Sequence, residues 1–244
     1  MEIFCFGDSH TRFFRRVNTL SWARIVRATT PRITAFDYAA ASAKGFAAGK
    51  ASRFAYRKFL GDYRAHVPQF LCLAYGQVDA EVGYYYRKYV KREERTPEAD
   101  LSAVYAAYVA MAEATIDSRP LVFKGLNPST LRLEIQLLNY AFRRPVVRIS
   151  DQPERERIWN DLRENPPTVA EHARINGLAN DILRQAVEGA GHRFFDIRSA
   201  VEDPEAPGLA RWDFVPSNSD VHLTDSSAVR KAHTIALYEV FNGF

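Results

Sequence analysis

A serine near the start of the chain and a histidine near its end have the types and the setting for nucleophilic chemistry. Ser9 lies in the segment GDSH (7–10), directly after an apolar run, and His222 lies in DVHLT (220–224), directly before an apolar helical pattern. A serine hydroxyl becomes a good nucleophile when a neutral imidazole accepts its proton, and the same imidazole can then protonate the leaving group. The types of these two residues are therefore compatible with nucleophilic chemistry at Ser9.

Ser9 also has a purely structural interpretation, because Ser and Asp both favour helix N-caps. Taken alone, Ser9 fits a cap as well as it fits a nucleophile, and an isolated histidine is more often a hydrogen-bonded polar residue than a base. The combination of the two motifs favours chemistry, provided that the fold brings both ends of the chain to one place.

Five short apolar runs, each followed by helical spacing, must position these residues. The runs are bounded by Gly, Pro or Asp, which is typical of strands covered on both faces. They span residues 2–6, 32–38, 70–75, 120–126 and 192–197. Alternating strands and helices predict one domain over residues 1–244, an α/β doubly wound, three-layer sandwich around a central parallel sheet of about five strands.

Helical spacing of apolar residues is clear in four segments, 101–116, 129–142, 169–191 and 226–241. Residues 127–129, Asn-Pro-Ser, predict the cap and first turn of the second of these helices. Two segments rich in Pro and acidic residues, 151–168 and 202–222, predict loops with at most a short helical turn.

Small and polar residues recur just past the predicted strands. They are Gly45, Gln77, Asp79, Asn127 and, after a long loop, His222. In an open parallel sheet, ligands bind beyond the carboxyl ends of the strands. We therefore expect these residues to gather around Ser9 at one edge of the sheet.

The pattern resembles the SGNH/GDSL hydrolase superfamily. The resemblance rests on "FGDSH" at the end of the first strand, a glycine-bearing loop after the second, "YGQVD" after the third and "DVHLT" before the last helix. It implies a flavodoxin-like fold and a serine esterase, lipase, thioesterase or carbohydrate O-acetyl esterase activity without a metal or an organic cofactor.

The resemblance also implies roles for individual residues. Ser9 would be the nucleophile and would donate its own backbone N–H to the oxyanion. Gly45, through its N–H, and Gln77, through its side-chain amide, would complete the oxyanion hole. His222 would be the base, and Asp220 would orient it. Two positions depart from the family pattern: Ser219 stands where the family usually has its Asp, and Gln77 replaces the usual Asn.

Four further residues are candidates for contact with the substrate, each with a structural alternative. Asp8 could instead cap a helix, Asp79 could cap the next segment, and Asn127 follows the fourth strand without a more specific signal. His10 directly follows the nucleophile and could line the pocket or fold away from it.

Composition narrows the class of protein. The 244 residues carry a net charge of +4, but no run of like charge forms, so nucleic acid is not the expected partner. No apolar run reaches the length of a membrane span, no signal peptide is recognisable, and Cys5 and Cys72 lie in apolar runs, so we expect a cytoplasmic protein with free thiols. The expected partner is a small-molecule or glycan acyl ester. An acyltransferase using the same site, or a catalytically silent glycan- or phosphate-binding protein, stays open.

Overall fold

The computed structural model describes residues 2–15, 32–52, 54–117, 120–146, 149–217 and 221–242. Its centre is a five-stranded parallel sheet in the order β2-β1-β3-β4-β5. The strands are β1 (Glu2–Gly7), β2 (Arg32–Asp37), β3 (Phe70–Ala74), β4 (Val122–Lys124) and β5 (Arg193–Phe195). The five predicted strands and the doubly wound topology are confirmed.

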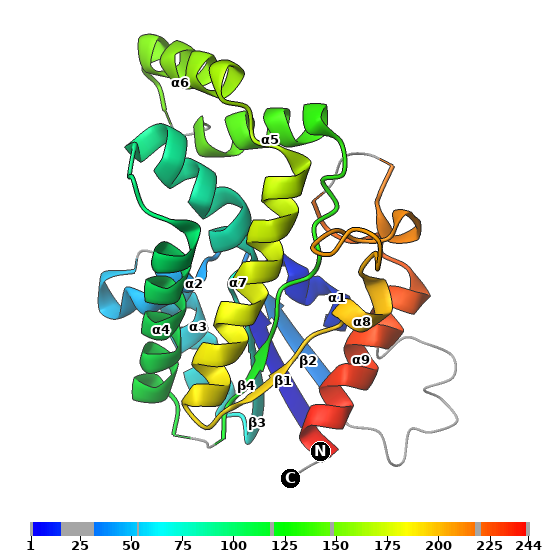
Figure 1. The fold of residues 1–244 in the computed structure, drawn as a ribbon. Helices are drawn as coiled ribbons and strands as arrows, with labels where there is room; N and C mark the ends of the chain where they lie inside the picture. Colours follow the sequence, from blue (N-terminus) through cyan, green and yellow to red (C-terminus); the bar gives the residue numbers. More distant parts are fainter. Residues whose placement is uncertain are drawn as a thin grey trace.

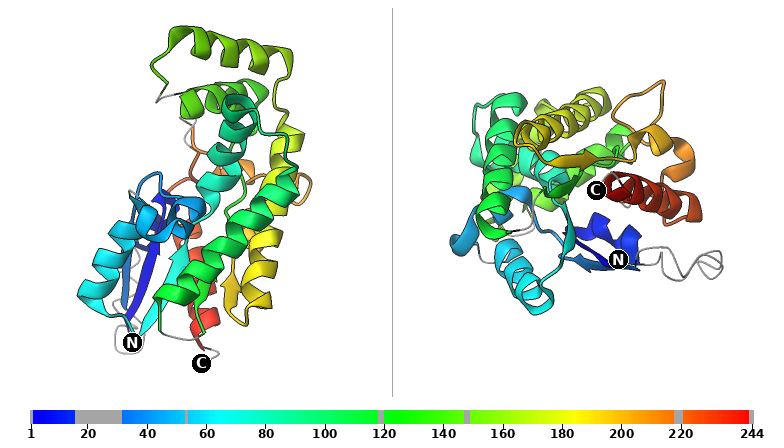
Figure 2. Two further views of the ribbon diagram at one scale, coloured as in Figure 1. Left: turned by 90° about the vertical axis from the view of Figure 1, so that its left-hand side faces the viewer. Right: turned by 90° about the horizontal axis from the view of Figure 1, so that it is seen from below.

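Helices cover both faces of the sheet (Figures 1 and 2). One face carries α2 (Ala43–Ala47), α3 (Ala55–His66), α4 (Pro97–Thr115) and α7 (Val169–Gly189), and the other carries α1 (Arg12–Arg15), α8 (Arg198–Val201) and α9 (Ser227–Asn242). Alternation along β1 explains why both faces are apolar: Phe4 and Phe6 pack with the first group, whereas Ile3 and Cys5 pack in a second core with α9.

Two helices, α5 (Glu134–Val146) and α6 (Gln152–Glu164), stand beyond the carboxyl edge of the sheet (Figures 1 and 2). The prediction of loops over 151–168 was wrong for α6. Its proline occupies the first helical turn, where no intrahelical N–H is needed, and Asp151 caps the helix by accepting a hydrogen bond from the Glu154 N–H at 3.2 Å. Arg157 then pairs with Glu154 and Asp161 along one face of the helix.

The predicted start of the helix over 129–142 was also wrong. Ser129 is not a cap: its N–H donates to Gly208 O at 2.8 Å and its carbonyl accepts from the Ala210 N–H at 2.8 Å. These bonds hold the segment extended against the 208–210 loop, so α5 begins only at Glu134. Among the described helices, none combines the length and the apolar character needed to cross a bilayer.

Candidate active site

The two ends of the chain meet at Ser9 and His222. β1 ends at Gly7, and the short 3-10 helix η1 (Ser9–Thr11) follows at once. A Cβ on Gly7 would lie 2.2 Å from Ala74 O, so only glycine allows the turn that displays Ser9. His222 reaches this edge from the loop before α9, and its Nε2 lies 2.7 Å from Ser9 Oγ. Both residues are partly exposed, so the pair can meet a ligand from solvent.

Asp8 caps η1. Its Oδ1 accepts a hydrogen bond from the His10 N–H at 2.9 Å, and the side chain is buried. Burial raises the pKa of this carboxyl, while the positive charge of Lys124 opposes the shift. The structure thus shows Asp8 in its capping role, and its contact with a substrate stays a prediction.

His10 lies between His222 and Asn127. Its ring centroid is 4.4 Å from that of His222, and its Nδ1 is 3.0 Å from Asn127 Nδ2. Burial, followed by the neighbouring His222, lowers the pKa of His10 well below the usual value, so the ring is neutral at pH 7. His10 therefore folds into the site, as one of its two sequence interpretations predicted.

Gly45 and Asp79 take part in hydrogen bonds at the start of α2. The Gly45 N–H donates to Ser42 Oγ at 2.9 Å, and Asp79 accepts from the N–H groups of Ala43 at 2.6 Å and Lys44 at 3.1 Å. Burial raises the pKa of Asp79 to about 6, against the pull of these two N–H donors. These contacts satisfy the first N–H groups of the helix, which need acceptors, and the roles of Gly45 as an oxyanion donor and Asp79 as a substrate contact stay predictions.

Gln77 and Asn127 bind each other. The Gln77 amide donates to Glu81 Oε1 at 2.7 Å and to Asn127 O at 3.2 Å, and its own Oε1 accepts from the Asn127 N–H at 2.9 Å. Both side chains are buried. Both donor hydrogens of the Gln77 amide are thus used within the protein, and the Asn127 side chain contacts His10; the predicted roles of Gln77 toward the oxyanion and of Asn127 toward the substrate stay predictions.

Sequence reasoning missed two buried ionisable groups below this network, Lys124 and Glu81. Lys124 Nζ donates to Asn127 Oδ1 at 2.9 Å and to Gly125 O at 2.8 Å, and burial lowers the pKa of the ammonium. Burial raises the pKa of Glu81 to about 8. The signal for Lys124 was present as a lysine inside the apolar run "PLVFKGL".

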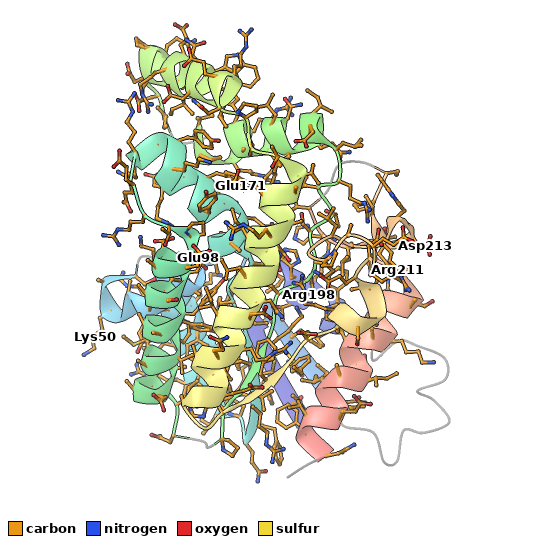
Figure 3. All side chains as sticks on the ribbon, viewed as in Figure 1. Lys50, Glu98, Glu171, Arg198, Arg211 and Asp213 are labelled. Carbon is orange, nitrogen blue, oxygen red and sulfur yellow. The ribbon has the colours of Figure 1, made fainter. Side chains whose placement is uncertain are left out.

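Asn127 is also held from α7. Asn176 Nδ2 donates to Asn127 O at 3.2 Å, and Arg198 of α8 donates to Asn176 Oδ1 at 2.9 Å (Figure 3). Arg198 in turn pairs with Glu202 in the next turn of the chain at 2.6 Å. The backbone of Asn127 is thereby fixed from both Gln77 and Asn176.

A second serine–histidine pair lies inside the protein. Ser129 Oγ is 2.9 Å from His172 Nε2, and Tyr85 Oη is 2.9 Å from His172 Nδ1. All three side chains are buried, and burial lowers the pKa of His172 to about 4. Near this pair, Glu171 at the start of α7 accepts hydrogen bonds from Tyr84 and Lys88 (Figure 3).

Asp220 lies outside the described residues, so its role as the orienting carboxylate stays a prediction. Within the described ranges, no group of three or more His, Cys, Asp or Glu side chains is arranged to hold a metal ion. Cys5 and Cys72 are buried free thiols.

No protein-family model matches the chain, and no curated protein matches it in sequence. Solved structures do match over nearly the whole chain. An acetyl xylan esterase variant from Geobacillus stearothermophilus superimposes with a TM-score of 0.53 at 10% identity, covering 98% of this chain and 93% of that one. A carbohydrate acetylesterase from Sinorhizobium meliloti gives 0.50 at 15% identity, with 100% and 99% covered. A protein described as a GDSL-like lipase from Parabacteroides merdae gives 0.51 at 15%, with 99% and 95% covered. The chain therefore has the fold of the SGNH/GDSL hydrolases.

Proposed function

We propose that this protein is a serine esterase that hydrolyses a small acyl ester, with Ser9 as the nucleophile and His222 as the base. The observation that carries the proposal is the 2.7 Å contact between His222 Nε2 and Ser9 Oγ, made by partly exposed side chains at the carboxyl edge of the sheet. A nucleophile and base within hydrogen-bond reach are what covalent acyl transfer needs.

The reaction would proceed in two steps. In the first, His222 Nε2 takes the Ser9 proton while Oγ forms a bond to the carbonyl carbon. The tetrahedral intermediate then expels the leaving alcohol, which receives the proton from His222, and an acyl ester remains on Ser9. In the second step, His222 takes a proton from a water molecule, whose oxygen attacks the acyl carbon. The bond to Ser9 Oγ then breaks, Ser9 regains its proton from His222, and the acid is released. The Ser9 N–H opens η1, where no intrahelical acceptor exists, so it is one candidate donor to the oxyanion.

For the substrate we propose an O-acetyl group on a sugar or glycan. Structural neighbours described as an acetyl xylan esterase and a carbohydrate acetylesterase support this class. A sugar hydroxyl is a leaving group that His222 can protonate, and a short acyl chain requires little apolar space.

The test compares the two serine–histidine pairs. The wild-type protein, Ser9→Ala and Ser129→Ala are incubated with a fluorophosphonate probe, with p-nitrophenyl acetate and with an acetylated monosaccharide. We expect one labelled serine per chain, together with nitrophenol and acetate release, in the wild type and in Ser129→Ala, and none above background in Ser9→Ala. Labelling that persists in Ser9→Ala contradicts the proposal, and acetyl transfer to an added sugar without acetate release identifies a transferase instead.

A further inference from the structure

The His10 side chain touches both the proposed base and the buried network behind it. It is 4% exposed, yet among the described residues its only hydrogen bond joins Nδ1 to Asn127 Nδ2 at 3.0 Å. No described residue accepts a hydrogen bond from its other ring nitrogen, Nε2. This nitrogen lies on the side of the ring away from Asn127.

Lys124 decides which way the Asn127 amide points. An ammonium group can only donate, so the Asn127 oxygen must face Lys124 Nζ, which is 2.9 Å away. The amide NH₂ then faces His10. The amide cannot swing away easily, since Gln77 and Asn176 fix the Asn127 backbone.

The tautomer of His10 follows from this orientation. A nitrogen that receives a hydrogen bond from an amide NH₂ must carry a lone pair, so Nδ1 is unprotonated. A neutral imidazole then carries its proton on Nε2. The low exposure of His10 and its contact with His222 keep the ring neutral.

We propose that His10 is a fixed, uncharged hydrogen-bond donor to the bound ester through Nε2–H, and that Lys124 and Asn127 are positioning residues that set its tautomer. The inference rests on the proposed esterase function. It adds a further donor at a site where the Gly45 N–H and the Gln77 amide already hydrogen-bond within the protein. A neutral donor beside His222 stabilises the negative charge that develops on the oxyanion. It adds no positive charge that would disfavour the imidazolium form of His222.

The tautomer is tested without any activity measurement. In ¹⁵N-histidine NMR spectra of the free wild-type protein, we expect His10 Nδ1 to be of the unprotonated type and Nε2 of the protonated type, with the signals assigned by their loss in His10→Gln. Asn127→Asp places a carboxylate oxygen opposite Nδ1, so we expect Nδ1 to become protonated. A wild-type spectrum with an unprotonated Nε2 overturns the proposal.

Kinetics with p-nitrophenyl acetate test the donor. His10→Phe keeps a ring beside His222 but removes the donor, and we expect kcat to fall about 100-fold with KM changed by less than about threefold. His10→Gln reaches as far as Nε2 with an amide N–H, so we expect kcat within about tenfold of wild type. The exposed residue His66, at the end of α3, provides the control His66→Gln with unchanged kinetics.

The outcomes separate the two proposals. Full activity in His10→Phe, or equal losses in His10→Phe and His10→Gln, overturns the role of His10 while the esterase function stands. A wild-type protein that hydrolyses no ester removes the proposed function, and the NMR spectrum then decides the tautomer by itself.

Discussion

Replacing Glu81 by Gln tests whether the network below the site holds a neutral carboxyl. Glu81 is 2% exposed, and it accepts hydrogen bonds from Gln77 Nε2 at 2.7 Å and from Tyr140 Oη at 3.4 Å. A glutamine has the shape of the protonated acid and can keep both contacts. At low pH the wild type, with Glu81 protonated, and Glu81→Gln should therefore be nearly equal in stability.

The size of the effect follows from the raised pKa. The pKa of Glu81 rises from 4.5 in the unfolded chain to about 8 in the folded protein because burial disfavours the charge. Between these values the folded state holds a proton that the unfolded state has lost, so the stability due to Glu81 decreases as the pH rises. Integration from pH 5 to pH 8.5 gives a loss of about 4 kcal/mol, which Glu81→Gln does not suffer.

Urea unfolding at pH 5 and pH 8.5 measures the difference, with the free energy of unfolding taken by linear extrapolation. Buried Asp79 and Lys124 are present in both proteins, so their contributions largely cancel, whereas the charge of Asp8, which helps to raise the pKa of Glu81, is part of the effect measured. We expect Glu81→Gln to match wild type at pH 5 and to exceed it by about 4 kcal/mol at pH 8.5. The exposed residue Glu188 supplies the control Glu188→Gln, with no such divergence. A difference between Glu81→Gln and wild type that is the same at both pH values refutes the reasoning.

Four further substitutions probe packing in the fold, each followed by urea unfolding. Gln77→Ala leaves several buried polar groups unpaired, so we expect a loss of about 3–5 kcal/mol in the free energy of unfolding; a stable variant with only a slower rate would support Gln77 as an oxyanion donor. Arg87→Met removes the ion-pair partner of the buried Asp100, with an expected loss of about 3–5 kcal/mol in the free energy of unfolding, and unchanged stability would contradict the contribution of this ion pair. Gly208 has φ +94°, and a Cβ there would lie 2.1 Å from a backbone carbonyl of α7, so Gly208→Ala should destabilise by at least about 2 kcal/mol. Gly61→Ala, in exposed helix with open space at Cβ, should instead stabilise by about 0.5–1 kcal/mol.

The strands could be predicted because short apolar runs between polar residues have few other uses in a chain of this size. The first residues of the helices were harder to predict, because they depend on contacts with residues far apart in the sequence. The N–H and C=O of Ser129 pair with the 208–210 loop, so the expected cap became extended chain. The prolines of 151–168 indicated a loop, yet a proline in the first turn is compatible with a helix, and α6 forms.

The directions of side chains in the site were also hard to predict, because they too depend on contacts between residues far apart in the sequence. The rule for the carboxyl edge of the sheet placed Ser9, His10 and His222 together, because it depends only on strand order. It could not say whether Gln77 and Asn127 point toward the nucleophile or toward each other. That choice is made by the buried groups Lys124 and Glu81, whose side chains impose the direction of each amide.

The two serine–histidine pairs show that a short Oγ to Nε2 distance does not by itself indicate a nucleophile. The distances are 2.7 Å for Ser9–His222 and 2.9 Å for Ser129–His172. A general base must become an imidazolium during the reaction, and burial opposes that charge at His172, whose pKa falls to about 4. An ester must also reach the hydroxyl, which a buried Ser129 does not allow. Ser9 meets both requirements because its partner is partly exposed and because the turn after β1 displays it at the edge where the strands end. Exposure and room for charge, more than distance, therefore favour Ser9 over Ser129 as the proposed nucleophile.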